Sequence, residues 1–174
     1  MKDVTISEED NLIIQSYYTV CLLNALGDKF TENTYFQDLE FNNDSIKEGL
    51  KHVTVQNQGS ALMALYAMLI IPKELIGKKY HIEYERINDF LNKECFDINT
   101  TYKNDKKKIN FLRHLRNAVA HANISFDPNN YMKFYDKNKK EEFNAKLSLS
   151  KMGKLLNELQ NVHLKYIEDR QKAL

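Results

Sequence analysis

Residues that interrupt helices are scarce in this chain, which has five glycines and two prolines among 174 residues. An all-β sandwich needs many tight turns, and those turns depend on glycine and proline. Hydrophobic residues make up 43% of the chain and charged residues 28%, enough both to build a core and to stay in solution. The sequence therefore predicts a single, mostly helical domain over residues 1–174.

Apolar residues at helical spacing indicate where those helices lie. Ser7, followed by three acidic residues, predicts the cap of a first helix that runs from about Glu9 to Phe30 and is broken near Gly27. We expect a second helix from Asp44 to Ile71 that Pro72 ends. Further helices are expected at about 82–95, at about 106–122 and from about 150 to the C-terminus. The weakly alternating segment 131–149, after a turn at 127–130, predicts a small β-hairpin. Together these elements predict a bundle of four to five helices with a hairpin before the last helix.

Cysteine usage and hydropathy predict a cytoplasmic protein that does not enter a membrane. Cys21 and Cys95 show no CxxC or Cys/His spacing, so we expect two reduced core thiols. The first ten residues are acidic and lack the apolar stretch of a secretory signal. The longest apolar run, Ala61–Ile71, is shorter than the ~20 residues that span a bilayer.

The net charge of +1 conceals an uneven distribution of charge along the chain. Residues 1–100 carry 9 basic and 16 acidic side chains, whereas residues 101–174 carry 16 basic and 8 acidic ones. A basic C-terminal half is typical of proteins that bind a polyanion. The alternative is that the two halves attract each other within one fold.

Residues 111–122 separate into two sets when they are drawn as a helix. With Arg116 at the origin and a step of about 100° per residue, one set falls within roughly 0–160° and the other within roughly 200–320°. The first set is Arg113, His114, Arg116, Asn117, Ala120 and His121, and the second is Phe111, Leu112, Leu115, Ala118, Val119 and Ala122. Arginine and histidine bind phosphate and transfer protons near neutral pH, so the first set forms either a functional site or a solvated helix face.

The run Arg116-Asn117-Ala118-Val119-Ala120-His121 resembles the R-x(4–6)-H motif of the HEPN superfamily, whose members are compact helical bundles. A polar residue directly after the arginine, here Asn117, is part of that pattern. The motif helix, with a hairpin and a final helix after it, is similar to prokaryotic branches linked to abortive infection and plasmid maintenance. The resemblance is strong over residues 106–126 and architectural elsewhere.

This resemblance implies a metal-independent endoribonuclease that acts as a homodimer, with two motif copies at the interface. His121 would serve as general base or acid, Arg116 would stabilise charge on the phosphate, and Asn117 would orient the His121 imidazole or the phosphate. His114 is a candidate second proton-transfer group or RNA contact. The separation of Arg116 and His121, about 140° around the helix and roughly 7.5 Å along it, agrees with a site that needs two copies.

RNA-binding side chains are expected next to this motif. Arg113, His114, Lys106, Lys107 and Lys108 are the main candidates, and Lys103, Lys137, Lys139 and Lys140 add positive charge. The alternative is that these lysines are ordinary solvated loop residues. Gln56-Asn57-Gln58 interrupts an apolar segment, and buried or kink-related hydrogen bonding is favoured there over a place in the cleft.

The five histidines are too scattered for a metal-ligand cluster, so no cofactor and no catalytic metal are expected. The expected partners are RNA, a second copy of the chain and a neutralising protein. Two alternatives remain open at this point: a HEPN-like module that binds RNA or nucleotide without cleaving it, and a helical interaction protein without a site.

Overall fold

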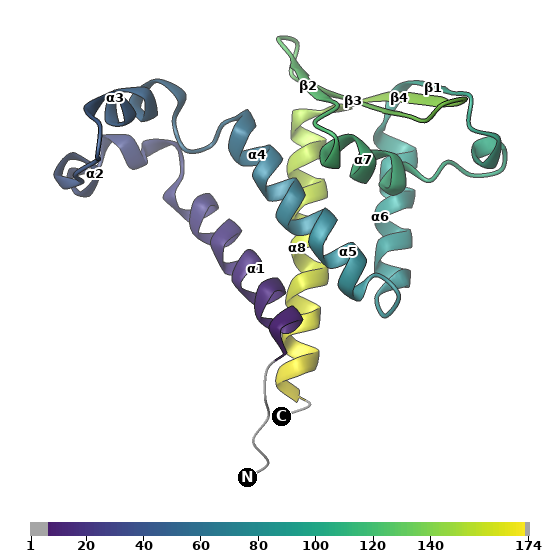
Figure 1. The fold of residues 1–174 in the computed structure, drawn as a ribbon, viewed down its shortest axis with the longest axis horizontal. Coiled ribbons are helices and arrows are strands. Elements are labelled where there is room, and N and C mark those ends of the chain that lie inside the picture. The colour runs from purple at the N-terminus through teal and green to yellow at the C-terminus, as the bar shows by residue number, and fades with distance from the viewer. Residues whose placement is uncertain (1–6, 173–174) are drawn as a thin grey trace.

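The computed structural model describes residues 7–172 and centres on the long C-terminal helix α8 (Leu149–Lys172). Beside α8 lie α1 (Glu8–Leu26), the helix formed by α4 (Gln58–Leu65) and α5 (Ile71–Ile76), and α6 (His81–Glu94) (Figure 1). Their apolar faces meet in one core whose fully buried members include Leu65, Met68, Leu91, Leu155 and Leu159. The burial of these stripes is the main force that holds the helices together.

Both ends of α1 follow from its sequence. Ser7 and Asp10 form a reciprocal capping box at its start, and Gly27 ends it with a φ of 62° that favours glycine. Asp10 also accepts hydrogen bonds from Tyr166 and Arg170, which fastens the start of α1 to the end of α8.

The predicted second helix, 44–71, was wrong at both its middle and its end. It is interrupted at 54–57, where Thr54 has a φ of 56° and Asn57 caps α4. From Gln58 the helix continues past Pro72 to Ile76. The π-helical turn η2 (Tyr66–Ile70) lies directly before the proline. Proline has no amide hydrogen to donate, and its ring clashes with the carbonyl of the preceding turn. A widened turn at this place leaves room for the ring and does not need the missing hydrogen bond.

Residues 28–53 form an arm that projects away from the bundle (Figure 1). The arm consists of η1 (Asp28–Glu32), α2 (Thr34–Asp38) and α3 (Asp44–Val53). Its small aromatic cluster centres on Phe36, which is fully buried against Phe30 and Phe41. Helix α3 itself buries no residue. The break expected near Gly27 is where α1 ends, and residues 28–30 belong to this arm and not to the first helix.

A four-stranded antiparallel sheet covers one end of the bundle, in the order β1-β4-β3-β2. The predicted hairpin corresponds to β3 (Tyr131–Lys137) and β4 (Glu142–Ser148). The edge strands β1 (Phe96–Thr100) and β2 (Ile124–Asp127) were missed, because five and four residues are too few to show a period. The inner face of the sheet packs on α7 (Phe111–Ala120).

With α4 and α5 counted as one continuous helix, the described residues contain seven α-helices beside this sheet, where four to five were expected. The predicted helix 106–122 is shorter than expected, since Asn110 caps α7 and a separate short turn, η3 (Lys103–Lys106), precedes it. One helix in the described part of the chain, Gln58–Ile76, has the length and composition to cross a membrane. In this fold it contacts α1, α7 and α8, and 33% of its apolar window is buried.

Candidate functional site

Helix α7 presents the two faces that its sequence predicts, with two exceptions. Phe111, Leu115 and Ala118 are fully buried, whereas Ala120 and His121 are exposed. Ala122 was expected in the core and is exposed instead, because α7 ends at Ala120 and Ala122 takes a φ of 54°. The second exception is His114, which is buried.

Arg116 lies where α7 meets α5, and its guanidinium is partly exposed. Its Nη1 is 2.7 Å from Oε1 of Glu74, and its Nη2 is 3.5 Å from Oδ1 of Asn117. About a third of the Arg116 side chain remains open to solvent (32%). The arginine is therefore held from two sides and still presents part of its guanidinium outward.

Lys73 and Glu74 of α5 add charge beside Arg116, and the sequence reasoning missed both. The Lys73 ammonium lies 4.4 Å from the centre of the Tyr84 ring. Burial lowers the pKa of Lys73, and the positive charge of Arg116 lowers it further. Two cations and one exposed carboxylate thus share this corner of the molecule. Only the packing of α7 against the η2 turn, from which the helix continues into α5, brings them together, so no sequence spacing could have revealed them.

His121 is the C-cap residue of α7 and its side chain is exposed. Its backbone amide still donates to the carbonyl of Asn117, 3.0 Å away, so the helical hydrogen bonding extends to His121. Arg116 and Asn117 are half-buried and His121 is exposed, so all three side chains reach solvent, with Arg116 and His121 about 140° apart around the helix. The contribution of each to catalysis stays a prediction.

The expectation that His114 contacts RNA was wrong, because the core encloses its imidazole completely. Nδ1 of His114 lies 2.7 Å from Asp136 Oδ2, and Nε2 lies 2.9 Å from Asp105 Oδ2. The ring also stacks on Phe143, with centres 4.0 Å apart and planes inclined by 2°. The helical projection placed His114 with the polar set, but it could not show that the sheet covers that side of α7.

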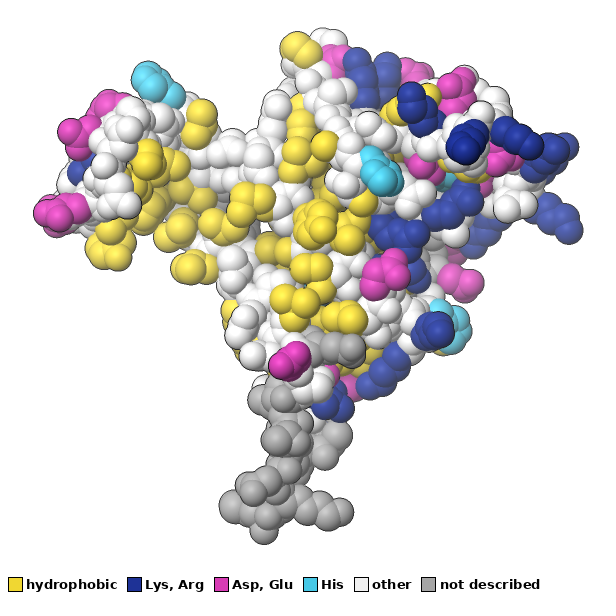
Figure 2. Space-filling model, viewed as in Figure 1, with side chains coloured by type: hydrophobic (Ala, Val, Ile, Leu, Met, Phe, Trp, Pro, Cys, Tyr) yellow, Lys and Arg dark blue, Asp and Glu magenta, His cyan; other side chains and the backbone are white. Residues whose placement is uncertain are grey.

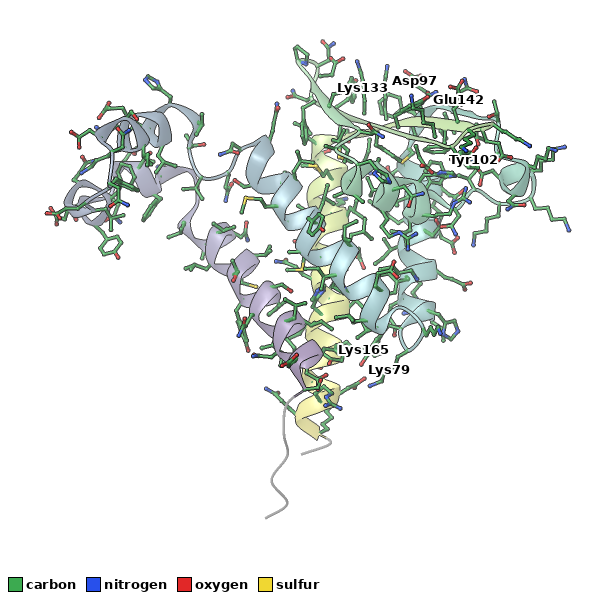
Figure 3. The ribbon with its side chains drawn as sticks, in the orientation of Figure 1. Lys79, Asp97, Tyr102, Lys133, Glu142 and Lys165 are labelled. Carbon is green, nitrogen blue, oxygen red and sulfur yellow. The ribbon has the colours of Figure 1, made fainter. Side chains whose placement is uncertain are left out.

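Arg113 connects this buried cluster to the surface. Its guanidinium stacks over the Tyr102 ring at 4.7 Å and lies 3.8 Å from Asp105 Oδ1. Tyr102 lies beneath the end of the sheet near Glu142 (Figure 3), and burial together with the charge of Asp136 raises its pKa. The Arg113 side chain is 31% exposed, so it presents part of its charge outward.

The lysines before α7 lie on the surface, as expected. Lys106, Lys107 and Lys108 are exposed, and Lys108 forms an ion pair of 2.6 Å with Asp89 that raises the lysine pKa. Lys137, Lys139 and Lys140 are exposed at the turn between β3 and β4. Figure 2 shows Lys and Arg side chains gathered on the side of the molecule that carries the sheet and α7.

The Gln56-Asn57-Gln58 segment lies away from α7, at the junction of the arm and the bundle. Gln56 Nε2 donates to the carbonyl of Asn24 at 3.2 Å, and Asn57 caps α4. This confirms the hydrogen-bonding interpretation for Gln56 and Asn57. The segment also lines a pocket of about 620 Å³ between α1, α4 and α8.

Metal and thiol chemistry are poorly represented among residues 7–172. No group of three or more His, Cys, Asp or Glu side chains in that range is arranged to hold a metal ion. Cys21 and Cys95 are free thiols, and burial raises the pKa of Cys95 to about 12.

Comparison with known protein families identifies the chain over almost its full length. The family model HEPN pEK499 p136 matches residues 7–170. No curated protein and no solved structure matches. The match covers the bundle, the arm, the sheet and the motif on α7, and it confirms the family that the Arg116–His121 spacing predicted. The chain therefore belongs to the HEPN superfamily, in a plasmid-associated branch.

Proposed function

We propose that this protein is a metal-independent endoribonuclease that cleaves RNA by attack of a 2′-hydroxyl on the adjacent phosphate. The observation that carries the proposal is that solvent reaches the Arg116, Asn117 and His121 side chains on α7. HEPN domains are often ribonuclease-like, which supports this assignment. DNA lacks the 2′-hydroxyl and would not react.

The reaction needs one group to remove a proton and another to supply one. The 2′-hydroxyl loses its proton to a general base, its oxygen forms a bond to phosphorus, and the bond to the 5′-oxygen breaks as that oxygen takes a proton from a general acid. The products are a 2′,3′-cyclic phosphate and a 5′-hydroxyl. His121 is the proton-transfer group, and Arg116 stabilises the charge that grows on the phosphoryl oxygens. Asn117 orients Arg116 through the contact of its amide oxygen.

A two-fold dimer would provide both proton-transfer groups, one His121 from each chain. Exposed apolar side chains lie on the helix that packs against α7, where a second chain would cover them: Met63, Tyr66 and Leu75 are 61%, 49% and 37% exposed. Figure 2 shows a broad apolar area over α1 and α4–α5. Apolar areas of this kind typically mark interaction surfaces.

Basic side chains that reach solvent near the motif would hold the RNA strand. Arg113, Lys106, Lys107 and Lys108 lie before or at the start of α7, and each contact to a phosphate releases counterions. We further propose that the protein acts in the cytoplasm as a growth-restricting or defence nuclease, held inactive by a neutralising partner protein until needed.

The test is incubation of the purified protein with total RNA in EDTA, with His121→Ala and Arg116→Ala as paired variants. We expect the wild type to leave 2′,3′-cyclic phosphate ends and each variant to lose about 10²–10⁴ in rate. His52→Ala, which alters an exposed histidine on the arm, is the matched control and should cleave normally. Cleavage that survives in the double variant, or that EDTA abolishes, would overturn the proposal.

A second candidate is a HEPN domain that binds RNA without cutting it, because Arg116 and His121 lie about 140° apart around α7 and one chain does not direct both at one phosphate. In that case the arginine contributes affinity, and no proton-transfer group is needed. RNA binding by the wild type without any cleavage, weakened by Arg116→Ala and unaffected by His121→Ala, would identify this function.

A further inference from the structure

Asp136 occupies an unusual place for a carboxylate. It is the third inward-facing residue of β3, after Met132 and Phe134, and it is only 4% exposed. Across the sheet it pairs with Phe143, which is also fully buried. An apolar side chain would satisfy this pattern, and a buried carboxylate carries a desolvation cost. Such departures from local rules concentrate at functional sites.

One oxygen of Asp136 accepts two hydrogen bonds from α7. Its Oδ2 lies 2.7 Å from Nδ1 of His114 and 3.2 Å from Nδ2 of Asn117. The second contact decides which way the Asn117 amide points, because a reversed amide would set two acceptor oxygens against each other. With its nitrogen toward Asp136, the amide turns its oxygen toward Arg116 Nη2 at 3.5 Å.

We propose that Asp136 is a positioning residue for the Arg116 guanidinium and acts through the Asn117 amide. The inference rests on the nuclease function proposed above, since the guanidinium is positioned for the phosphate that is cleaved. Asp136 fixes Asn117, and Asn117 aims the arginine. The sheet thus contributes to the geometry of a site whose other proposed members, Arg116, Asn117 and His121, all belong to α7 or its C-cap.

Asp105 provides a matched comparison within the same buried cluster. It is 6% exposed, and its Oδ2 accepts from His114 Nε2 at 2.9 Å and from Thr100 Oγ1 at 2.7 Å. It therefore shares the imidazole with Asp136, and among the contacts of the described residues it has none with Asn117. Loss of either carboxylate disturbs the core in a similar way, but only one of the two losses releases Asn117.

The experiment compares Asp136→Leu with Asp105→Leu, since leucine has a similar shape and no hydrogen-bond acceptor. Both variants should show a lowered Tm. We expect Asp136→Leu to reduce kcat about 10- to 100-fold with little change in KM, and Asp105→Leu to keep kcat within about twofold. Equal kcat values in the two variants would overturn the positioning role.

Two further measurements keep the inference testable if Asp136→Leu does not fold or the wild type does not cleave. Asn117→Leu alters a half-buried helix position, and it should reproduce the kcat loss without the loss of Tm. The ¹⁵N NMR signals of the Asn117 side-chain amide and the Arg116 guanidinium should shift in Asp136→Asn, which folds more readily, and stay in place in Asp105→Asn. A wild type that cleaves no RNA refutes the proposed function, whereas unshifted Asn117 and Arg116 signals refute the positioning role by themselves.

Discussion

Replacing Glu74 with glutamine should strengthen RNA binding by releasing Arg116. The Glu74 carboxylate and an RNA phosphate compete for the same guanidinium, since Oε1 lies 2.7 Å from Arg116 Nη1. Glutamine keeps the size of the side chain and removes its negative charge. We therefore expect a gain in affinity, in contrast to the usual effect of altering a residue beside a site.

The size of the gain follows from the exposure of the pair. The Glu74 side chain is 65% exposed and that of Arg116 is 32% exposed, so solvent screens their attraction. Ion pairs of this kind contribute about 0.2–1 kcal/mol, which corresponds to a gain of about 1.4- to 5-fold in affinity. The gain should be larger at low salt, because dissolved ions screen exposed charges.

The assay is fluorescence anisotropy with a labelled 2′-O-methyl RNA, which binds without being cleaved, at about 50 and 200 mM salt. Glu48→Gln is the matched control, since Glu48 also forms an exposed pair of 2.7 Å, with Lys51 on the arm. The gain should vanish when Glu74→Gln is combined with Arg116→Ala. An equal gain from Glu48→Gln, or one that persists without Arg116, would refute the reasoning.

Three further predictions concern stability and assembly. Phe143→Ala removes a fully buried ring and should cost about 3–5 kcal/mol, or about 6–20 °C in Tm by calorimetry; a loss below about 1 kcal/mol would contradict the packing. Tyr66→Lys alters an exposed residue beside Met63 and should change the free energy of unfolding by less than about 0.5 kcal/mol. In light scattering it should convert a dimer to a 20.5 kDa monomer. A wild type that is already monomeric would rule out the dimer. Burial lowers the pKa of His163, so the unfolded chain binds the proton more tightly and stability falls as pH drops through about 6.5. In urea unfolding at pH 7 and pH 5, His163→Phe, which keeps the stacking on Tyr17, should reduce that fall; equal pH dependence would count against burial as its cause.

Local patterns of the sequence predicted the parts of the fold that depend on local physics. The sequence predicted the cap at Ser7, the end of α1 near Gly27 and the buried stripe of α7 through Phe111 and Leu115. A cap or a stripe depends only on neighbours within a turn or two, so the sequence alone is enough to predict it. The family followed from six consecutive residues for the same reason.

The errors arose where distant segments decide the outcome. His114 has the chemistry of a surface residue, and only the approach of Asp105 and Asp136 makes a buried imidazole stable. Pro72 was expected to end a helix that instead continues after a π-helical turn. Asp136 did carry a readable signal, since it follows Met132 and Phe134 at the period of a strand, but its partner Asn117 lies 19 residues away on a different element.

The arm of residues 28–53 begins and ends at almost the same place. The hydrogen bond from Gln56 to the carbonyl of Asn24 joins the chain that enters the arm to the chain that leaves it. A segment with adjoining ends has the geometry of an insertion, and its removal leaves only a short gap to bridge. A few flexible residues between Asn24 and Gln56 would close that gap, so the bundle, the sheet and α7 should fold as a smaller protein. The arm is therefore a replaceable part, free to change length and sequence while the bundle, the sheet and α7 stay constant.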